Sequence, residues 1–482
     1  MSFVSFAFIP FFLIVFTLYW FFFKKNLAKQ NLLLFVASYI FYGFWDWRFT
    51  FLLLFSTLLD YYLSHLIQNS RSDSQRKNYF ILSLVVNLSI LGVFKYFNFF
   101  STSFSQFLGL FHIEVDPILL NLVLPVGISF YTFHGISYIF DVYTRKISPE
   151  KDFVVYAIFV SFFPLLVAGP IERATHLLPQ IQKPRKFDYL LAKEGIRQFL
   201  WGLFKKLVIA DNCGFFANMI FDDIDKVSGS TYLIGAIFFS FQIYADFSGY
   251  SEMASGTAKL LGFNLIRNFA YPYFSKSLVE FWRSWHISLS SWFRDYLYIP
   301  MGGSDHGSIR RIFNVFFVFC ISGLWHGASW NFVLWSLANW FFLLPKLFTG
   351  HFDITVSKWV KNDFQQVLLD AFRIIKTFLL VSLIWIFFRV GSVSEIKFIF
   401  SQIFSSSFFT IPEFRFMENS YVVGVLVIFF LMIEWFGRSG DFALKNLLKG
   451  QSKAFRWSFY YFLILIMLYK SGQEQTFIYF QF

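Results

Sequence analysis

Two histidines stand in apolar, tryptophan-rich surroundings, where a titratable side chain is costly. His326 lies in ISGLWHGASWNF (321–332), and His286 lies in SLVEFWRSWHISLSSWFRDYLYIPMGG (277–303). Imidazole is the side chain best suited to accepting a proton near neutral pH, so these positions suggest general base catalysis. On chemistry alone, a structural histidine remains open for both. The same holds for His134 in FYTFHGISYIFDVY.

Polar side chains surround His286 in a stretch that the sequence predicts to be one helix. Its aromatic residues recur at spacings typical of one helical face, namely Trp282, Trp285, Leu289, Trp292 and Tyr296. Arg283, His286, Ser290 and Arg294 fall on another face. The arginines either snorkel from an interfacial helix or belong to a functional polar stripe.

Further polar residues in YADFSG have two open interpretations. Asp246 and Ser248 either line a reaction chamber or form a structural hydrogen bond between helices. The candidate substrate-binding residues are therefore Arg283, Ser290, Arg294, Asp295, Asp246, Ser248 and Trp325.

The elements that must position these residues are membrane helices. The chain of 482 residues is 57% hydrophobic and only 15% charged, with 76 phenylalanines, which is far from the composition of a soluble domain. Its apolar runs are continuous, whereas the strands of a membrane β-barrel alternate. We predict an all-α polytopic membrane protein with roughly 10–12 membrane helices. The main apolar runs are 3–23, 51–66, 81–94, 153–171, 231–244, 312–325, 377–388, 421–433 and 459–468.

Charge sets the expected topology. The net charge of +12 is spread among short loops, which favours the positive-inside rule over nucleic-acid binding. With the basic loops around residues 24–29, 71–77 and 145–151 in the cytoplasm, 113–116 and the N-terminus lie outside. The run 3–23 reads as a retained first span. Cys213 and Cys320 have no metal or CxxC spacing, so a disulfide scaffold or thiolate metal site is not supported.

Two segments are expected to line a cavity rather than to span. SFFPLLVAGPIERATHLLPQIQKPRK (161–186) is apolar, broken by proline and glycine, and has basic loops on both sides, which favours a re-entrant hairpin. Irregular backbone at membrane depth is tolerated where it is buried in protein or lines a cavity. The segment 275–300 is likewise expected to line a cavity, because it is too polar for an ordinary span and too aromatic for a solvent loop.

His326 is expected near the turn of a helical hairpin. If Arg310 and Arg311 are cytoplasmic, 312–325 runs outward and 330–344 returns. A helix of this length rises roughly 21 Å, which is less than the hydrocarbon core of about 30 Å. His326 would then lie within the bilayer and be reached through a cavity.

The chain resembles the membrane-bound O-acyltransferases, most closely their alginate O-acetyltransferase-like bacterial branch. WHISLSSWFRDYLYIP and SGLWHGASW are the most specific blocks, and Leu165 departs from the longer polar residue that relatives often carry. The blocks that carry the resemblance, in the family's order, are LPVGISFYTFHGISYIFDVY (124–143), FFPLLVAGPIERA (162–174), YADFSGYSEMASGTAKLLGF (244–263), FWRSWHISLSSWFRDYLYIPMGG (281–303), ISGLWHGASWNFVLW (321–335) and FIYFQF (477–482).

The resemblance implies a bundle with re-entrant segments around a central tunnel, in a single domain over residues 1–482. Within it, N-terminal helices (1–110), a catalytic core (117–345) and C-terminal helices (371–482) are expected. It also implies His326 as the catalytic base and His286 as a second histidine that activity requires. A neutral imidazole can take the proton of an attacking hydroxyl. Because GxSxG is missing and neither cysteine has a base beside it in sequence, direct attack is favoured over an acyl-enzyme, although Cys320 remains a candidate nucleophile.

The function expected is transfer of an acetyl group from a cytoplasmic thioester, acetyl-coenzyme A, to an exported polysaccharide or to an extracytoplasmic accessory acetyltransferase. The location expected is the bacterial cytoplasmic (inner) membrane, with membrane lipid as a partner and no nucleic acid. No bound cofactor or metal is expected, because the P-loop, GxGxxG and HExxH motifs are missing. Two alternatives stay open: D-alanyl transfer from a carrier protein to teichoic acid, and a non-enzymatic membrane transporter.

Overall fold

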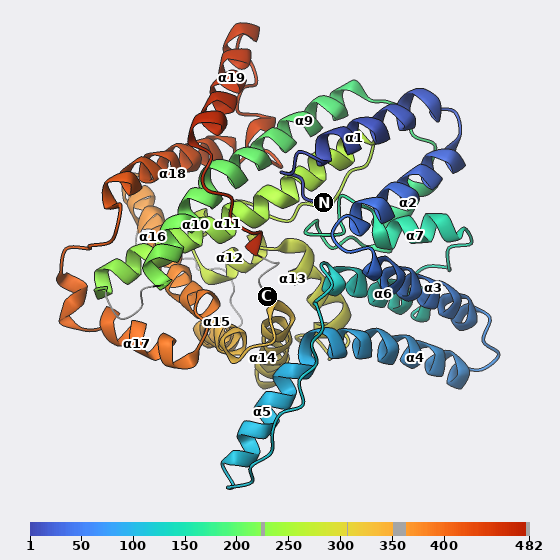
Figure 1. Cartoon of the computed structure of the whole chain (residues 1–482), viewed down its shortest axis with the longest axis horizontal. Helices are drawn as coiled ribbons and strands as arrows, with labels where there is room; N and C mark the ends of the chain where they lie inside the picture. The colour runs from blue at the N-terminus through green and yellow to red at the C-terminus, as the bar shows by residue number, and fades with distance from the viewer. Residues whose placement is uncertain (223–226, 306, 350–362, 479–482) are drawn as a thin grey trace. The chain divides into compact units, whose positions relative to one another are not determined.

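The computed structural model describes all residues except 223–226, 306, 350–362 and 479–482. Its described residues form helices joined by turns and loops, which confirms the all-α prediction (Figure 1). Contacts divide the chain into two compact units: unit 1 holds Met1–Ile196 and Ala254–Ile266, and unit 2 holds Arg197–Met253 and Arg267–Phe482. The single domain expected over residues 1–482 stays a prediction.

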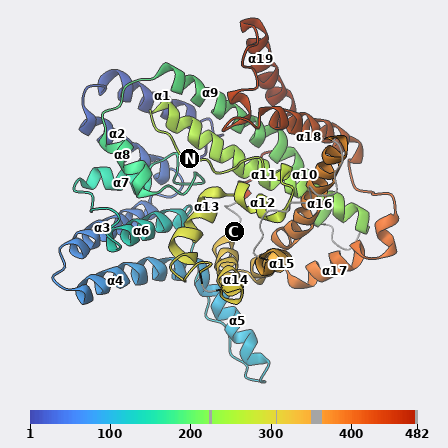
Figure 2. The same cartoon turned by 180° about the vertical axis from the view of Figure 1, so that it is seen from behind.

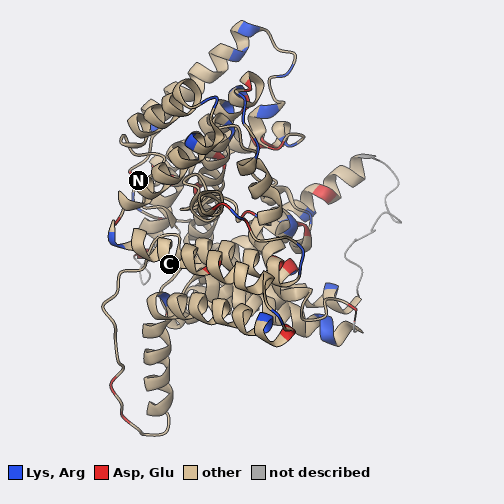
Figure 3. Cartoon of the chain, turned by 90° about the vertical axis from the view of Figure 1, so that its right-hand side faces the viewer, with Lys and Arg blue, Asp and Glu red and all other residues tan. Residues whose placement is uncertain are grey.

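Six helices in the described part of the chain are long and apolar enough to cross a membrane. They are Arg48–Gln68, Asp73–Gly109, Gly307–His326, Trp330–Thr349, Phe364–Arg389 and Met417–Gly437. A shorter apolar helix covers Phe8–Phe22. Figure 3 shows long stretches of ribbon without charged residues. The lysines, arginines and acids of the chain lie mainly near helix ends and in connecting segments. The chain is a multi-pass membrane protein, and the total of roughly 10–12 membrane helices stays a prediction.

The described elements that lie wholly in unit 1 are eight α-helices and two five-residue π-helical segments. Helices α3, α4 and α6 lie side by side in both views (Figures 1 and 2). The buried Asp60 of α3 joins α3 to α4, since it accepts hydrogen bonds from Ser83 Oγ at 2.7 Å and Asn87 Nδ2 at 2.9 Å. The helices of unit 1 are α1 (Phe8–Thr17), η1 (Leu18–Phe22), α2 (Leu27–Gly43), α3 (Arg48–Gln68), α4 (Asp73–Leu91), η2 (Gly92–Tyr96), α5 (Phe97–Gly109), α6 (Ile128–Tyr143), α7 (Phe153–Ser161) and α8 (Ala174–Gln182).

The expected break in the apolar run 153–171 is present. Helix α7 ends at Ser161, and the chain through Pro164 and Gly169 is non-helical until α8 begins at Ala174. The side chains of this connection are buried, including Phe162, Leu166 and Glu172. The run is therefore not one spanning helix, and its backbone has the burial that an irregular segment at membrane depth requires.

Unit 2 holds both histidines of interest. Two helices, α9 (Tyr189–Phe204) and α11 (Gly229–Leu260), have residues in both units. The remaining elements are η3 (Lys205–Ala210), α10 (Asp211–Asp222), η5 (Pro272–Phe274), α12 (Leu278–Ser284), α13 (Ile287–Phe293), η6 (Arg294–Tyr298), α14 (Gly307–His326), α15 (Trp330–Thr349), α16 (Asp363–Arg389), α17 (Val393–Ile403), η8 (Ser406–Phe409), α18 (Met417–Gly437), η9 (Ala443–Lys445) and α19 (Lys453–Lys470).

Helices α14 and α15 form the predicted antiparallel hairpin. Near its open end, Trp340 Nε1 donates to Ile312 O at 3.3 Å. Gly323 lets the helices approach, because a side-chain carbon there would lie 2.5 Å from the carbonyl oxygen of Phe332. His326 is the last residue of α14, so its expected place near the turn is confirmed.

The stretch 275–300 is not the single helix that its periodicity predicts. Helix α12 ends at Ser284, and His286 adopts a left-handed backbone (φ 44°, ψ 53°) before α13 begins. A tertiary contact replaces helical hydrogen bonding at the break, since Ile287 N donates to Asn268 O at 2.8 Å. The aromatic face from Trp282 to Tyr296 and the polar stripe from Arg283 to Arg294 were therefore wrong as continuous helical faces.

Candidate active site

His326 is packed among aromatic rings at the end of α14. Its ring centroid lies 5.0 Å from Trp335 of α15 and 5.3 Å from Phe388 of α16. The turn that allows this begins at Gly327, where a side-chain carbon would overlap the Phe332 ring. Only 4% of His326 is exposed, so water reaches this imidazole poorly.

His286 is held by an amide whose orientation is fixed. The backbone N–H of Ser288 donates to Asn268 Oδ1 at 3.3 Å, so this atom must be the amide oxygen. His286 Nδ1 lies 3.0 Å from the same oxygen, and therefore Nδ1 carries a proton and donates. In the neutral imidazole, Nε2 then holds the lone pair and is the nitrogen that can accept a proton.

The Asn268 side chain is itself anchored on both sides. Its Nδ2 donates to Ser251 Oγ of α11 at 3.0 Å, and its Oδ1 also accepts from Ser288 Oγ at 2.9 Å. Phe247 of α11 stands edge-on to the His286 ring at 4.6 Å. Hydrogen bonding and packing thus fix both the tautomer and the orientation of this ring.

Trp325 connects the two histidines. Its ring centroid lies 4.9 Å from that of His326 and 5.8 Å from that of His286. The structure therefore places both predicted catalytic residues against one indole, although their positions are forty residues apart in sequence. Trp325 is 3% exposed, so it belongs to the same buried region.

Further tryptophans extend the aromatic wall beside His326. Trp335 stacks on Trp385 with centroids 5.6 Å apart, and Trp385 contacts Trp285 at 5.0 Å. Trp282 packs on Trp335 at 5.6 Å. An apolar lining of this kind excludes water and strengthens electrostatic interactions within the site.

The remaining predicted substrate-binding residues divide by burial. Arg283 and Arg294 are exposed, and Arg294 pairs with the neighbouring Asp295 at 2.9 Å. Ser290 is half-buried in α13. The structure does not bring the two arginines into the aromatic region around His326, and their contact with substrate stays a prediction.

Asp246 and Ser248 are buried and bond to lysines. Lys206 lies 3.1 Å from Asp246 and 2.7 Å from Asp211, and Lys205 Nζ donates to Ser248 Oγ at 3.3 Å. These contacts join α11 to η3, so polar bonding between helices is the interpretation of this pair that the geometry favours.

Sequence reasoning missed most of this buried charge network. Lys205 pairs with Glu434 of α18 at 2.7 Å and with Glu252 at 3.1 Å, and Tyr244 Oη donates to Glu434 at 2.7 Å. A signal was present, because LFKKLVIAD (203–211) places two lysines within an apolar stretch, and ionisable residues there require partners. Asn268 gave no such signal, since its role depends on tertiary structure.

The segment after α19, called here the C-terminal strap (471–478), also reaches this network. Lys206 Nζ donates to Gln475 O at 2.8 Å, and Ile478 N donates to Asp246 Oδ2 at 2.8 Å. Phe477 packs on Tyr250 with centroids 4.1 Å apart. The strap thus packs against the helix that carries Phe247. The other residues of the FIYFQF motif, 479–482, lie outside the described residues.

Comparisons of the sequence with known proteins give matches over most of the chain. A sequence model described as MBOAT, membrane-bound O-acyltransferase family, matches residues 40–368. A Pseudomonas aeruginosa protein named "Probable alginate O-acetylase AlgI" is 36% identical over 412 residues, covering 85% of this chain and 76% of that protein. A Helicobacter pylori peptidoglycan O-acetyltransferase is 35% identical over 400 residues, covering 77% and 73%. A Bacillus subtilis teichoic acid D-alanyltransferase is 30% identical over 230 residues, covering 45% and 57%.

Proposed function

The chain belongs to the membrane-bound O-acyltransferase family and is an O-acyltransferase, and from this premise we propose that it acetylates hydroxyl groups of an exported polysaccharide. The acceptor class follows from relatives named for alginate and peptidoglycan. We propose acetyl-coenzyme A, supplied from the cytoplasm, as the donor. The proposed location is the bacterial cytoplasmic membrane, and an accessory acetyltransferase outside the membrane is proposed to receive or to finish the transfer.

The observation that carries the mechanism is the pair of buried histidines on one indole. We propose that His326 accepts the proton of the acceptor hydroxyl as its oxygen attacks the thioester carbonyl. The carbon–sulfur bond breaks, the ester forms, and the coenzyme leaves as its thiol after it regains a proton. His286 presents Nε2 as an acceptor and is proposed to orient the hydroxyl or to serve as the second proton acceptor.

Direct transfer between the two substrates is proposed in preference to a covalent acyl-enzyme. Cys320 lies six residues before His326 on α14, which is more than one and a half helical turns. Cys213 is fully buried. A Cys320→Ser variant is expected to retain activity, because no step of direct transfer by the enzyme uses a protein thiol.

Substrate-binding roles are also proposed for Arg283, Arg294 and Asp295, with the two guanidinium groups facing the phosphates of the donor.

The test uses sealed membrane vesicles of both orientations that contain the full chain. Radiolabelled acetyl-coenzyme A is expected to yield labelled polysaccharide esters when it is supplied at the cytoplasmic face, and His326→Gln should abolish them. Equal labelling from the outer face would contradict the proposal that the donor enters from the cytoplasm and the acceptor from outside. Mass spectrometry of the ester separates the alternatives: an acetyl ester supports the proposal, whereas a D-alanyl ester supports D-alanyl transfer to teichoic acid. Ester formation that does not depend on the chain would favour the alternative that the chain is a membrane transporter.

A further inference from the structure

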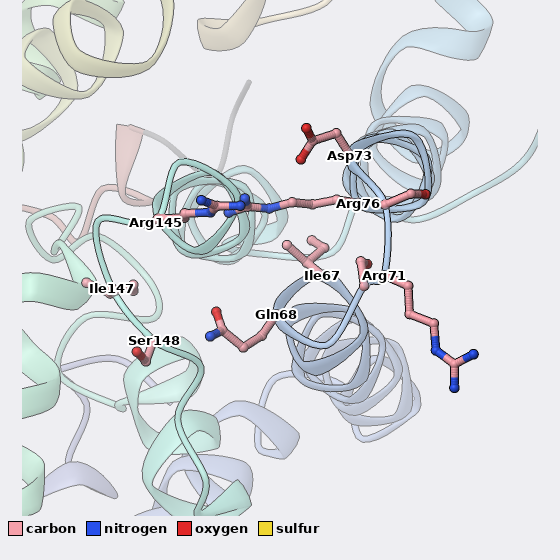
Figure 4. A pocket seen from close by; sticks show the side chains of 10 residues that line it. Ile67, Gln68, Arg71, Asp73, Arg76, Arg145, Ile147 and Ser148 are labelled. Carbon is pink, nitrogen blue, oxygen red and sulfur yellow. The ribbon is translucent and has the colours of Figure 1, made fainter.

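A polar pocket in unit 1 lies far along the chain from both catalytic histidines. Its volume is about 510 Å³, and it is formed where α3 ends, α4 begins and the chain leaves α6 (Figure 4). That volume is within the range of roughly 300–1,000 Å³ that small-ligand sites occupy. Its lining residues are Ile67, Gln68, Ser70, Arg71, Ser72, Asp73, Arg76, Arg145, Ile147 and Ser148.

The pocket is electropositive. Three arginines line it against a single acid, Asp73. The N-terminus of α4, a helix of 19 residues capped by Ser72, adds the positive end of its dipole. The Ser148 hydroxyl and the Gln68 amide supply neutral donors. Together, guanidinium groups, a helix N-terminus and a hydroxyl form the donor set that binds phosphate.

Arg76 has donor capacity beyond its structural contacts. Its terminal nitrogen donates to Val142 O at 3.2 Å and to Tyr143 O, at the C-terminal end of α6. Figure 4 shows this side chain reaching toward that helix, whereas Arg71 extends the other way. The Nε of Arg76 is buried and has no hydrogen-bond partner among the residues that the structure describes. A guanidinium carries five N–H donors, and the two carbonyls occupy those of one terminal nitrogen only, so donors remain for a ligand in the pocket.

Arg145 occupies a backbone conformation that favours glycine. Its φ is 60°, and the following N–H, of Lys146, donates to Asp141 O at 2.9 Å, as at a helix end closed by a left-handed residue. A non-glycine residue here is strained. The positive-inside rule explains a basic loop, but it does not require the charge at the one strained position that faces the pocket.

The position of the pocket at the ends of two candidate spans favours a lipid as the source of the phosphate. Helices α3 and α4 are both candidate membrane spans, and the pocket lies at the ends that the loop 69–72 joins. Such ends lie at the level of lipid headgroups. We propose that this pocket binds the phosphate group of an anionic phospholipid headgroup, with Arg145 and Arg76 as its main ligands. The proposal does not depend on acyl transfer.

The test is native mass spectrometry of the full-length, detergent-solubilised protein titrated with phosphatidylglycerol. Arg145→Gly removes the charge and relieves the backbone strain, so the variant should melt no lower than wild type. It should nevertheless bind phosphatidylglycerol about tenfold more weakly. Arg145→Lys should retain most of the binding. Lys77→Gln is the matched control, because Lys77 is exposed on α4 and does not line the pocket.

Each outcome decides the proposal. Weaker binding in Arg145→Gly with unchanged binding in Lys77→Gln supports it. Equal loss in both variants would reduce the effect to general surface charge and overturn it. A second titration uses coenzyme A and inorganic phosphate as soluble sources of the same group. If these bind wild type and lose affinity in Arg145→Gly while phosphatidylglycerol does not, the lipid assignment is wrong.

Discussion

Asn268 decides which nitrogen of His286 is basic. Because its oxygen accepts from Ser288 N, the imidazole must donate through Nδ1 and present Nε2. We expect Asn268→Ala to lower kcat on the order of 10²-fold with little change in KM, since the ring loses its orientation and not its substrate contacts. Steady-state kinetics on purified protein measures the split.

The matched variants separate orientation from general loss of packing. Asn268→Asp keeps an acceptor oxygen for His286 and Ser288 and should retain far more activity than Asn268→Ala. Ser251→Ala removes only the outer hydrogen bond to Asn268 and should have the mildest effect. If Asn268→Asp were as inactive as Asn268→Ala, the tautomer argument would fail.

His326 is expected to matter through proton transfer and not through stability. His326→Gln and His326→Ala should lose about 10²-fold to 10⁴-fold in rate, the range for removal of a general base, while membrane abundance stays normal. Ester formation and immunoblotting of membranes measure the two quantities. Full activity of His326→Gln would exclude the role. His286→Ala should also lose most activity, and a drop in abundance alone would make His286 structural.

At the scale of the element, the α14–α15 hairpin depends on glycine at its turn. A methyl group at Gly327 would overlap the Phe332 ring, and the ring of Phe332 in turn contacts Phe388 at 4.7 Å. We expect Gly327→Ala to lower activity about 10-fold to 10²-fold by displacing His326. Gly424→Ala is the control, because a side-chain carbon there meets nothing within 4 Å.

A second-site change provides the decisive measurement for the hairpin. Phe332→Val removes the three ring carbons that the added methyl group would meet, Cδ2, Cε2 and Cζ, so the double variant should recover part of the lost activity. A double variant no better than Gly327→Ala would mean that the damage does not come from this overlap.

Helices could be predicted wherever local pattern and tertiary structure agree. The apolar runs 312–325 and 421–433 each fall within one helix. The stretch 275–300 has an equally clear helical period, yet it breaks at His286, because Asn268 supplies hydrogen bonds from outside the segment. Sequence periodicity records only neighbours three or four residues away, so it could not find Asn268 or the partners of Lys206. His286 and His326 were identified instead by their apolar surroundings and by the resemblance of their motifs to a known family.

At the scale of the whole molecule, the charge pattern predicts which loops face outward. The basic loop 437–453 is expected in the cytoplasm like the loop 71–77. Single cysteines at Ser74, Glu114 and Gln451, which are all exposed, test this in a Cys213→Ser, Cys320→Ser background. Only the cysteine at 114 should react with an impermeant thiol reagent in intact cells. Reaction at 74 or 451 before permeabilisation would overturn the topology.

The C-terminal strap has a consequence for the order in which the contacts of the protein form. Lys206 precedes its acceptor Gln475 by 269 positions, and Asp246 precedes its donor Ile478 by 232. Before the strap is synthesised, Asp211 and Asp246 are already available to the lysine but Gln475 is not, so the contacts of this charge cluster are complete only once the strap has been made. Quality-control proteases degrade chains that stay incompletely folded. In a pulse-chase experiment, a chain stopped after Ser471 should be inserted normally and then degraded faster than the full chain, whereas equal lifetimes would show that closure of the cluster is not the final step of assembly.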